Sequence, residues 1–212
     1  YTLPKYQLTC GIVDIMMHTM ERYFTPVDGN ELTDEIAEGV LRTVIRNGLK
    51  AYEDQQNYDA LSEIMWCGSI SHNNMTGLGR PKDFACHKLG HEIGGMFDEA
   101  HGATLSAVWG SWARYVYKEN VTRFAQFAVN VMGVTNDFKS PEHTALAGIE
   151  AMEDFYRAIG MPVSICELIG RQATDEEIKL MADKCSSGGT TTGNLKVLHR
   201  DDMKNIYRMA NR

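Results

Sequence analysis

The sequence is 212 residues long, and 43% of its residues are hydrophobic and 23% charged. This length and composition provide for a sizeable buried core, which excludes a disordered chain. The formal net charge of −7 is spread along the chain without a block of like charges, so nucleic acid is not an expected partner.

No segment approaches the roughly 20 consecutive apolar residues of a membrane span, so no membrane partner is expected. The start, Tyr1 to Lys5, lacks both the features of a signal peptide and an initiator methionine, and we expect a chain cut from a longer one. Wide, irregular spacing of an odd number of cysteines favours free thiols and a cytoplasmic location. The cysteines are Cys10, Cys67, Cys86, Cys166 and Cys185.

Apolar residues at three- and four-residue intervals predict helices in the first part of the chain. The first helix is expected over residues 7–23. The second begins near Leu32, and its buried side should carry Leu32 and Val40, while Asp34 and Glu38 should face water.

Further helices are expected over residues 58–70 and 83–97, separated by a turn with two glycines and a proline. His101 should stand at the start of the next helix, because Leu105 and Trp112 follow it on one helical face.

Further helices are expected over residues 121–132, 140–159 and 201–209. A capping box formed by Thr174 and Glu177 predicts one more helix, which reaches about Lys184. Alternating segments typical of strands are almost absent, and no internal repeat is visible. The predicted fold class is all-α.

Asp14 and His18 lie four residues apart on the first predicted helix, so their side chains share one face and can chelate one ion. An unpaired carboxylate on a buried stripe is energetically costly, which makes this pair unusual. A simple hydrogen bond between the two side chains is the alternative, and for this pair taken alone it is the favoured one.

His87 and His91 repeat this spacing on a later helix, and His101 follows. Three imidazole nitrogens and one carboxylate oxygen would suit Zn²⁺ or Fe²⁺. The pattern is not the metalloprotease motif His-Glu-x-x-His, because Gly95 stands where its second histidine is needed. Surface or capping roles are expected for the histidines without a partner at ligand spacing: His72, His143 and His199.

Several stretches, taken in order, resemble one known family: Thr2-Leu3-Pro4, Gly11-Ile12-Val13-Asp14 with His18, the block from His87 to Gly102, and Ile206-Tyr207. The sequence is similar over essentially its whole length to the iron-containing (group III) alcohol dehydrogenases, butanol dehydrogenase branch. The resemblance implies a divalent metal, Fe²⁺ or Zn²⁺, held by Asp14, His18, His87 and His101.

The resemblance also implies a catalytic and cofactor-binding position for His91, beside the nicotinamide and the substrate, where it is a candidate for proton relay. The ion would polarise the substrate oxygen while hydride passes between a primary alcohol or aldehyde and NAD(H) or NADP(H). Domains of this family commonly pair, so a homodimer that acts on a small-molecule alcohol or aldehyde is expected.

Members of the family carry an amino-terminal α/β domain that holds the nucleotide, and this sequence contains no counterpart of it. Residues 1–212 are therefore expected to form the helical, metal-binding catalytic domain of the fold shared with dehydroquinate synthase. The fragment is expected to be inactive alone.

Two other hypotheses stay open. An all-helical metal-dependent phosphohydrolase would activate water for attack on a phosphate ester, but it usually shows a His-Asp doublet, whereas this chain has His91-Glu92. A purely structural ion would only hold helices together. Trp109 and Trp112 could line an apolar substrate pocket, although core packing is favoured for at least one of them.

Overall fold

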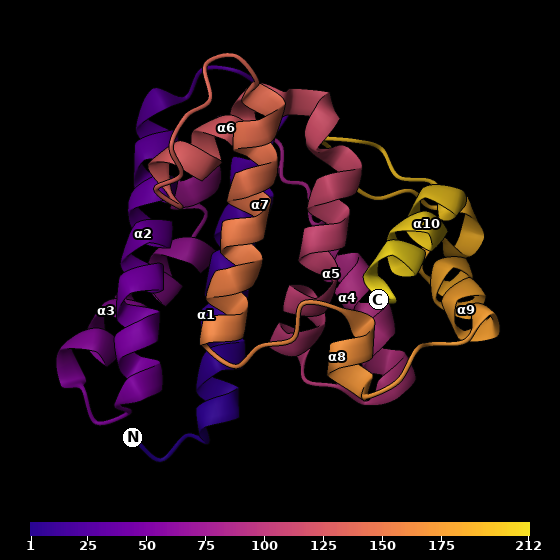
Figure 1. The fold of residues 1–212 in the computed structure, drawn as a ribbon, viewed down its shortest axis with the longest axis horizontal. Coiled ribbons are helices and arrows are strands. Elements are labelled where there is room, and N and C mark those ends of the chain that lie inside the picture. The colour runs from indigo at the N-terminus through magenta and orange to yellow at the C-terminus, as the bar shows by residue number, and fades with distance from the viewer.

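A computed structural model describes residues 1–212 as ten α-helices with three short 3-10 helices between them (Figure 1). The all-α prediction is confirmed, since the only strand-like feature is an isolated bridge between Thr192 and Leu198. The elements are α1 (Lys5–Tyr23), α2 (Glu31–Glu53), α3 (Tyr58–His72), η1 (Met75–Gly77), α4 (Ala85–Phe97), α5 (His101–Val116), η2 (Tyr117–Asn120), α6 (Val121–Asn130), α7 (Pro141–Ala158), α8 (Ile165–Ile169), α9 (Asp175–Cys185), η3 (Ser187–Gly189) and α10 (Arg200–Ala210).

Helix α5 is the central helix, and it contacts α1, α4, α7 and α10. In Figure 1 it lies between the group formed by α1, α2 and α3 and the pair α9 and α10 near the C-terminus. Trp109 and Trp112 of α5 are buried, so core packing was the correct interpretation for both. They belong to one hydrophobic core of 51 residues that extends through the whole chain.

Helix α1 forms as the periodicity predicted, with Ile12, Met16 and Met20 fully buried. The capping box of Thr174 and Glu177 opens α9 as expected. These agreements arise where local chemistry alone decides, because a repeating apolar face and a side-chain cap need no distant partner.

The prediction for α2 was wrong at its first turns. Leu32 is 74% exposed, whereas Asp34 and Glu38 are buried. Asp34 forms ion pairs with Arg80 and Arg123, and Glu38 accepts a hydrogen bond from Tyr23 at 2.8 Å. Periodicity assigned these acids to water because their partners lie far away in the sequence.

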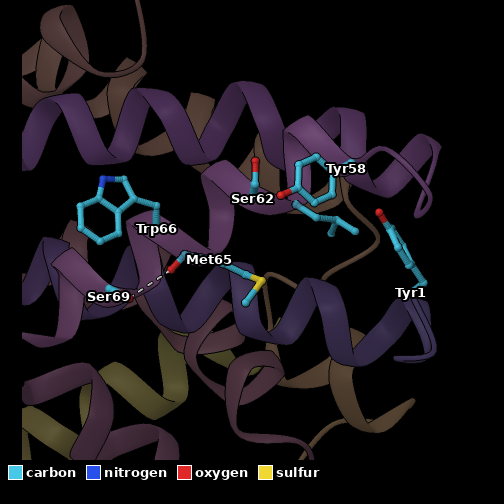
Figure 2. Close-up of a pocket in the computed structure, with 7 residues that line it drawn as sticks. Tyr1, Tyr58, Ser62, Met65, Trp66 and Ser69 are labelled. Carbon is cyan, nitrogen blue, oxygen red and sulfur yellow. Dashed lines mark hydrogen bonds between the residues drawn. The ribbon is translucent and has the colours of Figure 1, made fainter.

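Helix α3 presents apolar side chains to the surface. Met65 and Trp66 are 75% and 65% exposed and line an open groove together with Tyr1, Tyr58 and Leu61. Figure 2 shows Trp66 at one end of this groove and Tyr1 at the other. None of the groove residues is a predicted metal ligand, so the groove is separate from the predicted site.

All five cysteines are free thiols, as expected, and four of them are buried. No helix combines the length and the apolar character that crossing a membrane requires.

Candidate metal centre

Three helices bring the four predicted ligands to one place. Asp14 and His18 lie one turn apart on α1, His87 lies in the first turn of α4, and His101 is the first residue of α5. The Nε2 atoms of His18, His87 and His101 are 3.7, 3.5 and 3.4 Å from Asp14 Oδ1. Each of these histidines therefore faces the carboxylate of Asp14.

The nitrogens divide into two sets around the shared carboxylate. Donor atoms of Asp14, His87 and His101 all lie within 4.8 Å of one another, and so do those of Asp14, His18 and His72. His72 is 45% exposed and its Nδ1 lies 2.9 Å from the backbone oxygen of Gly68 in the last turn of α3, as a surface or capping role predicts, but its Nε2 is also 3.4 Å from Asp14 Oδ2. Sequence spacing missed His72 because α3 reaches α1 only through tertiary packing.

Two buried polar atoms at the centre of the cluster have no hydrogen-bond partner. They are Asp14 Oδ1 and His87 Nε2. Burying such atoms without partners costs free energy, and a cation between them removes the cost because each atom offers it a lone pair. The donor set, one carboxylate and several imidazoles, therefore fits a divalent transition-metal ion.

Glu21 fixes the ring of His87 at Nδ1, the ring nitrogen that does not face Asp14. Its carboxylate accepts a hydrogen bond from the His87 backbone N–H at 3.1 Å and contacts His87 Nδ1 through the other oxygen. Both side chains are buried. A carboxylate on the far nitrogen fixes the tautomer and orientation of a metal-binding histidine, so Glu21 is a positioning residue that sequence reasoning missed.

The start of α4 is fixed just before His87. Asp83 accepts backbone hydrogen bonds from Ala85, Asn194 and Leu195, so it ties this helix to a distant loop. Phe84 follows with φ of 55°, a left-handed conformation that is unusual for a bulky residue. Its ring packs beside His87, with 5.1 Å between ring centroids.

A close approach between α1 and α5 brings His101 to Asp14. A Cβ atom at Gly102 would overlap the backbone of Cys10, so only glycine allows the two helices to meet here. Because Gly102 follows His101 directly, this contact sets the distance between His101 and α1.

The charges of the cluster are linked. Burial raises the pKa of the Asp14 carboxyl, but His101, His87 and His18 outweigh this effect and hold the pKa well below its ordinary value. Burial lowers the pKa of His18 to about 4. Burial would also lower the pKa of His87, but the carboxylates of Asp14 and Glu21 raise it to about 9.

His91 lies one turn after His87 on the exposed side of α4. Its ring centroid is 5.0 Å from that of His101 and 6.2 Å from that of His87. Burial and the nearby charge of His101 lower the pKa of His91, which favours the neutral form of its ring.

The two other histidines lie away from the cluster, as expected. His143 is largely exposed and pairs with Asp137 at 3.5 Å. His199 caps the start of α10.

Comparison with known proteins identifies the family. Residues 9–211 match the sequence profile described as "Fe-containing alcohol dehydrogenase family, C-terminal". The chain is 32% identical over 214 residues to NADH-dependent butanol dehydrogenase A of Clostridium acetobutylicum, covering 99% of this chain and 54% of that protein. It is also 32% identical over 210 residues to a probable NADH-dependent butanol dehydrogenase 1 of Bacillus subtilis, covering 99% and 53%.

Solved structures agree with this match over the whole fold. The chain superposes on the substrate- and cofactor-free aldehyde reductase of Escherichia coli with a TM-score of 0.92 and 31% identity, covering 99% of this chain and 54% of that one. It also superposes on an NADH-dependent butanol dehydrogenase A from Thermotoga maritima with a TM-score of 0.91 and 32% identity. That match covers 100% of this chain and 54% of the other one.

The chain spans about half the length of these relatives. The profile match covers nearly all of its residues, and the relatives agree with it in sequence and in structure. The chain therefore belongs to the iron-containing alcohol dehydrogenase family and corresponds to the helical C-terminal part of its members.

Proposed function

We propose that this chain is the metal-binding catalytic part of an NAD(P)H-dependent oxidoreductase that interconverts primary alcohols and aldehydes. A divalent ion would be held by Asp14, His18, His87 and His101, and the unpartnered atoms Asp14 Oδ1 and His87 Nε2 carry this proposal. When bound, the ion supplies a Lewis acid for the substrate oxygen. Relatives named as butanol dehydrogenases and an aldehyde reductase support the class of substrate.

The protein side chains orient the donors around this ion. Glu21 holds the proton of the His87 ring on Nδ1, which leaves Nε2 free to face Asp14. Arg22 contacts both the Nδ1 atom and the backbone oxygen of His18. Ligation through His18 Nε2 requires a proton on Nδ1, so we expect Arg22 to keep only its contact with the backbone oxygen when an ion binds.

His91 is proposed to move the proton that accompanies hydride transfer. Its lowered pKa and its place beside His101 suit a group that accepts a proton from an alcohol and returns it to an aldehyde. The nicotinamide dinucleotide, NAD(H) or NADP(H), would be bound outside these residues, since the helical chain offers no βαβ unit. Residues 1–212 are thus proposed as one domain that does not turn over substrate alone.

We further propose a cytoplasmic homodimer. The five free thiols fit a reducing compartment. The phosphohydrolase alternative is not supported, because the named relatives are dehydrogenases and reductases.

Elemental analysis with an activity assay tests the proposal. After incubation with Fe²⁺ or Zn²⁺ and gel filtration, the chain should retain one ion, and Asp14→Asn and His87→Ala variants should retain none. A fusion protein should then be made that joins this chain to the unmatched part of butanol dehydrogenase A. It should oxidise NADH in the presence of butyraldehyde. Asp14→Asn should remove that activity, and retention of full activity without an ion would contradict the proposal.

A further inference from the structure

Phe84 directly precedes α4 in a backbone conformation that bulky residues rarely adopt. Its φ of 55° and ψ of 20° lie in the left-handed region, where a side chain crowds its own backbone. Glycine takes this conformation without that penalty. A phenylalanine at this position therefore needs a compensating contact elsewhere in the molecule.

The surrounding residues hold this conformation in place. The backbone N–H of Asp83 donates to the backbone oxygen of Glu21 at 2.7 Å. The Asp83 carboxylate accepts from the backbone N–H of Ala85 on one oxygen. Its other oxygen accepts from the backbone N–H groups of Asn194 and Leu195. Strained residues persist where their surroundings over-determine them, and they concentrate at functional sites.

Core packing does not account for the ring of Phe84. Other phenylalanines, such as Phe24 and Phe127, belong to the hydrophobic core, and Phe97 packs against it. Phe84 is half-buried and is in neither group. Its ring contacts the candidate metal centre instead.

The ring of Phe84 packs against two predicted ligands that come from different helices. Its centroid is 5.6 Å from that of His18 on α1 and 5.1 Å from that of His87 on α4. Both separations fall within the range of packed aromatic pairs. The rings of His18 and His87 are themselves 4.4 Å apart, so the three rings close a triangle.

Hydrogen bonds alone leave both imidazoles able to turn. Glu21 fixes the ring of His87 only at Nδ1, so the ring can still pivot about that contact. The Nδ1 atom of His18 faces Arg22, which is a donor and not a carboxylate or a carbonyl. The Arg22 guanidinium in turn lies over the Phe84 ring at 5.1 Å. The ring of Phe84 therefore limits the rotation of both imidazoles.

We propose that Phe84 is a positioning residue of the metal centre, whose ring holds the imidazoles of His18 and His87 in the orientation that binds the ion. The strained backbone is kept because it places the ring there. This inference rests on the proposed function, because it presupposes that an ion occupies the cluster.

Co²⁺ binding and urea denaturation of variants at this position test the proposal. Phe84→Gly and Phe84→Ala both remove the ring, but only glycine also relieves the left-handed strain. Phe84→Gly should therefore be at least as stable to urea as Phe84→Ala. Both should bind Co²⁺ about 10-fold more weakly in competition with a chelator, and the visible absorption bands of the bound Co²⁺ should shift. Phe84→Tyr keeps the ring and should keep both the affinity and the bands.

Asp98→Gly is the matched control, because Asp98 follows the other end of α4 with a φ of 56° but is exposed and outside the cluster. It should leave the Co²⁺ affinity and the bands unchanged, and circular dichroism should show all variants folded. If Phe84→Gly binds Co²⁺ with unchanged affinity and bands, this inference alone is overturned. If the unmodified chain binds no Co²⁺, the proposed function fails and this inference fails with it.

Discussion

Two carboxylates, Asp14 in the middle of α1 and Asp34 in the first turn of α2, differ in how their charge is balanced. Asp34 has an arginine on each oxygen, since Arg80 contacts Oδ1 and Arg123 contacts Oδ2. Asp14 meets only imidazoles, and its Oδ1 lacks a hydrogen-bond partner. Asp34 is neutralised by two fixed arginines, whereas Asp14 faces imidazoles, which are the donors that the proposed ion would need.

The neighbouring glutamates repeat this contrast. Glu38 accepts hydrogen bonds from the side chains of Tyr23, Gln126 and Asn130, and we call these four residues the Glu38 network. Glu21 instead directs the ring of His87 toward Asp14. A buried acid whose partners are all fixed donors stabilises the fold, whereas one that orients a free nitrogen prepares a binding site.

The largest expected effect is the difference in stability loss between replacing Asp34 and replacing Asp14. Asp34→Ala leaves Arg80 and Arg123 buried without a counter-charge, which should lower the free energy of unfolding by about 3 to 5 kcal/mol. Asp14→Ala in the metal-free chain should cost less, about 1 to 3 kcal/mol, because the imidazoles around Asp14 can lose their protons whereas an arginine cannot. Urea denaturation measures both, and equal losses would remove the distinction between the two regions.

Metal removal should affect only the region around Asp14. An ion present at about 100 times its Kd stabilises the chain by roughly 2.7 kcal/mol, so a chelator should lower Tm by roughly 5 to 10 °C. Asp14→Asn should melt at the same temperature with and without the chelator. A chelator effect that persisted in this variant would place the ion elsewhere.

The smallest expected effect concerns the two glutamates. Glu21→Gln should weaken metal binding by about 10- to 100-fold, because an amide holds the His87 ring less firmly in the ligating orientation. Glu38→Gln is the matched control, since it is equally buried but lies in the other network. It should cost about 1 to 3 kcal/mol of stability and leave the metal affinity unchanged, as isothermal titration would show. Weaker binding in both variants would mean that the networks are coupled.

The sequence alone determined the longer helices, but not the short α8, and most of the candidate site. The apolar stripe of α1 and the spacing of Asp14 and His18 are local properties of one helix. The same holds for the place of His101 at the start of α5. Such features persist whichever way the helices later pack, so they could be predicted from the residues.

Tertiary structure alone decided which side chains complete these groups. The end of α3 folds against α1 and brings His72 to Asp14, and Glu21 reaches His87 across 66 positions of sequence. Asp34 looked solvated because its arginines lie 46 and 89 residues away. Helical periodicity reports which residues share a face, but the charge and hydrogen bonds that a face meets depend on the helix packed against it.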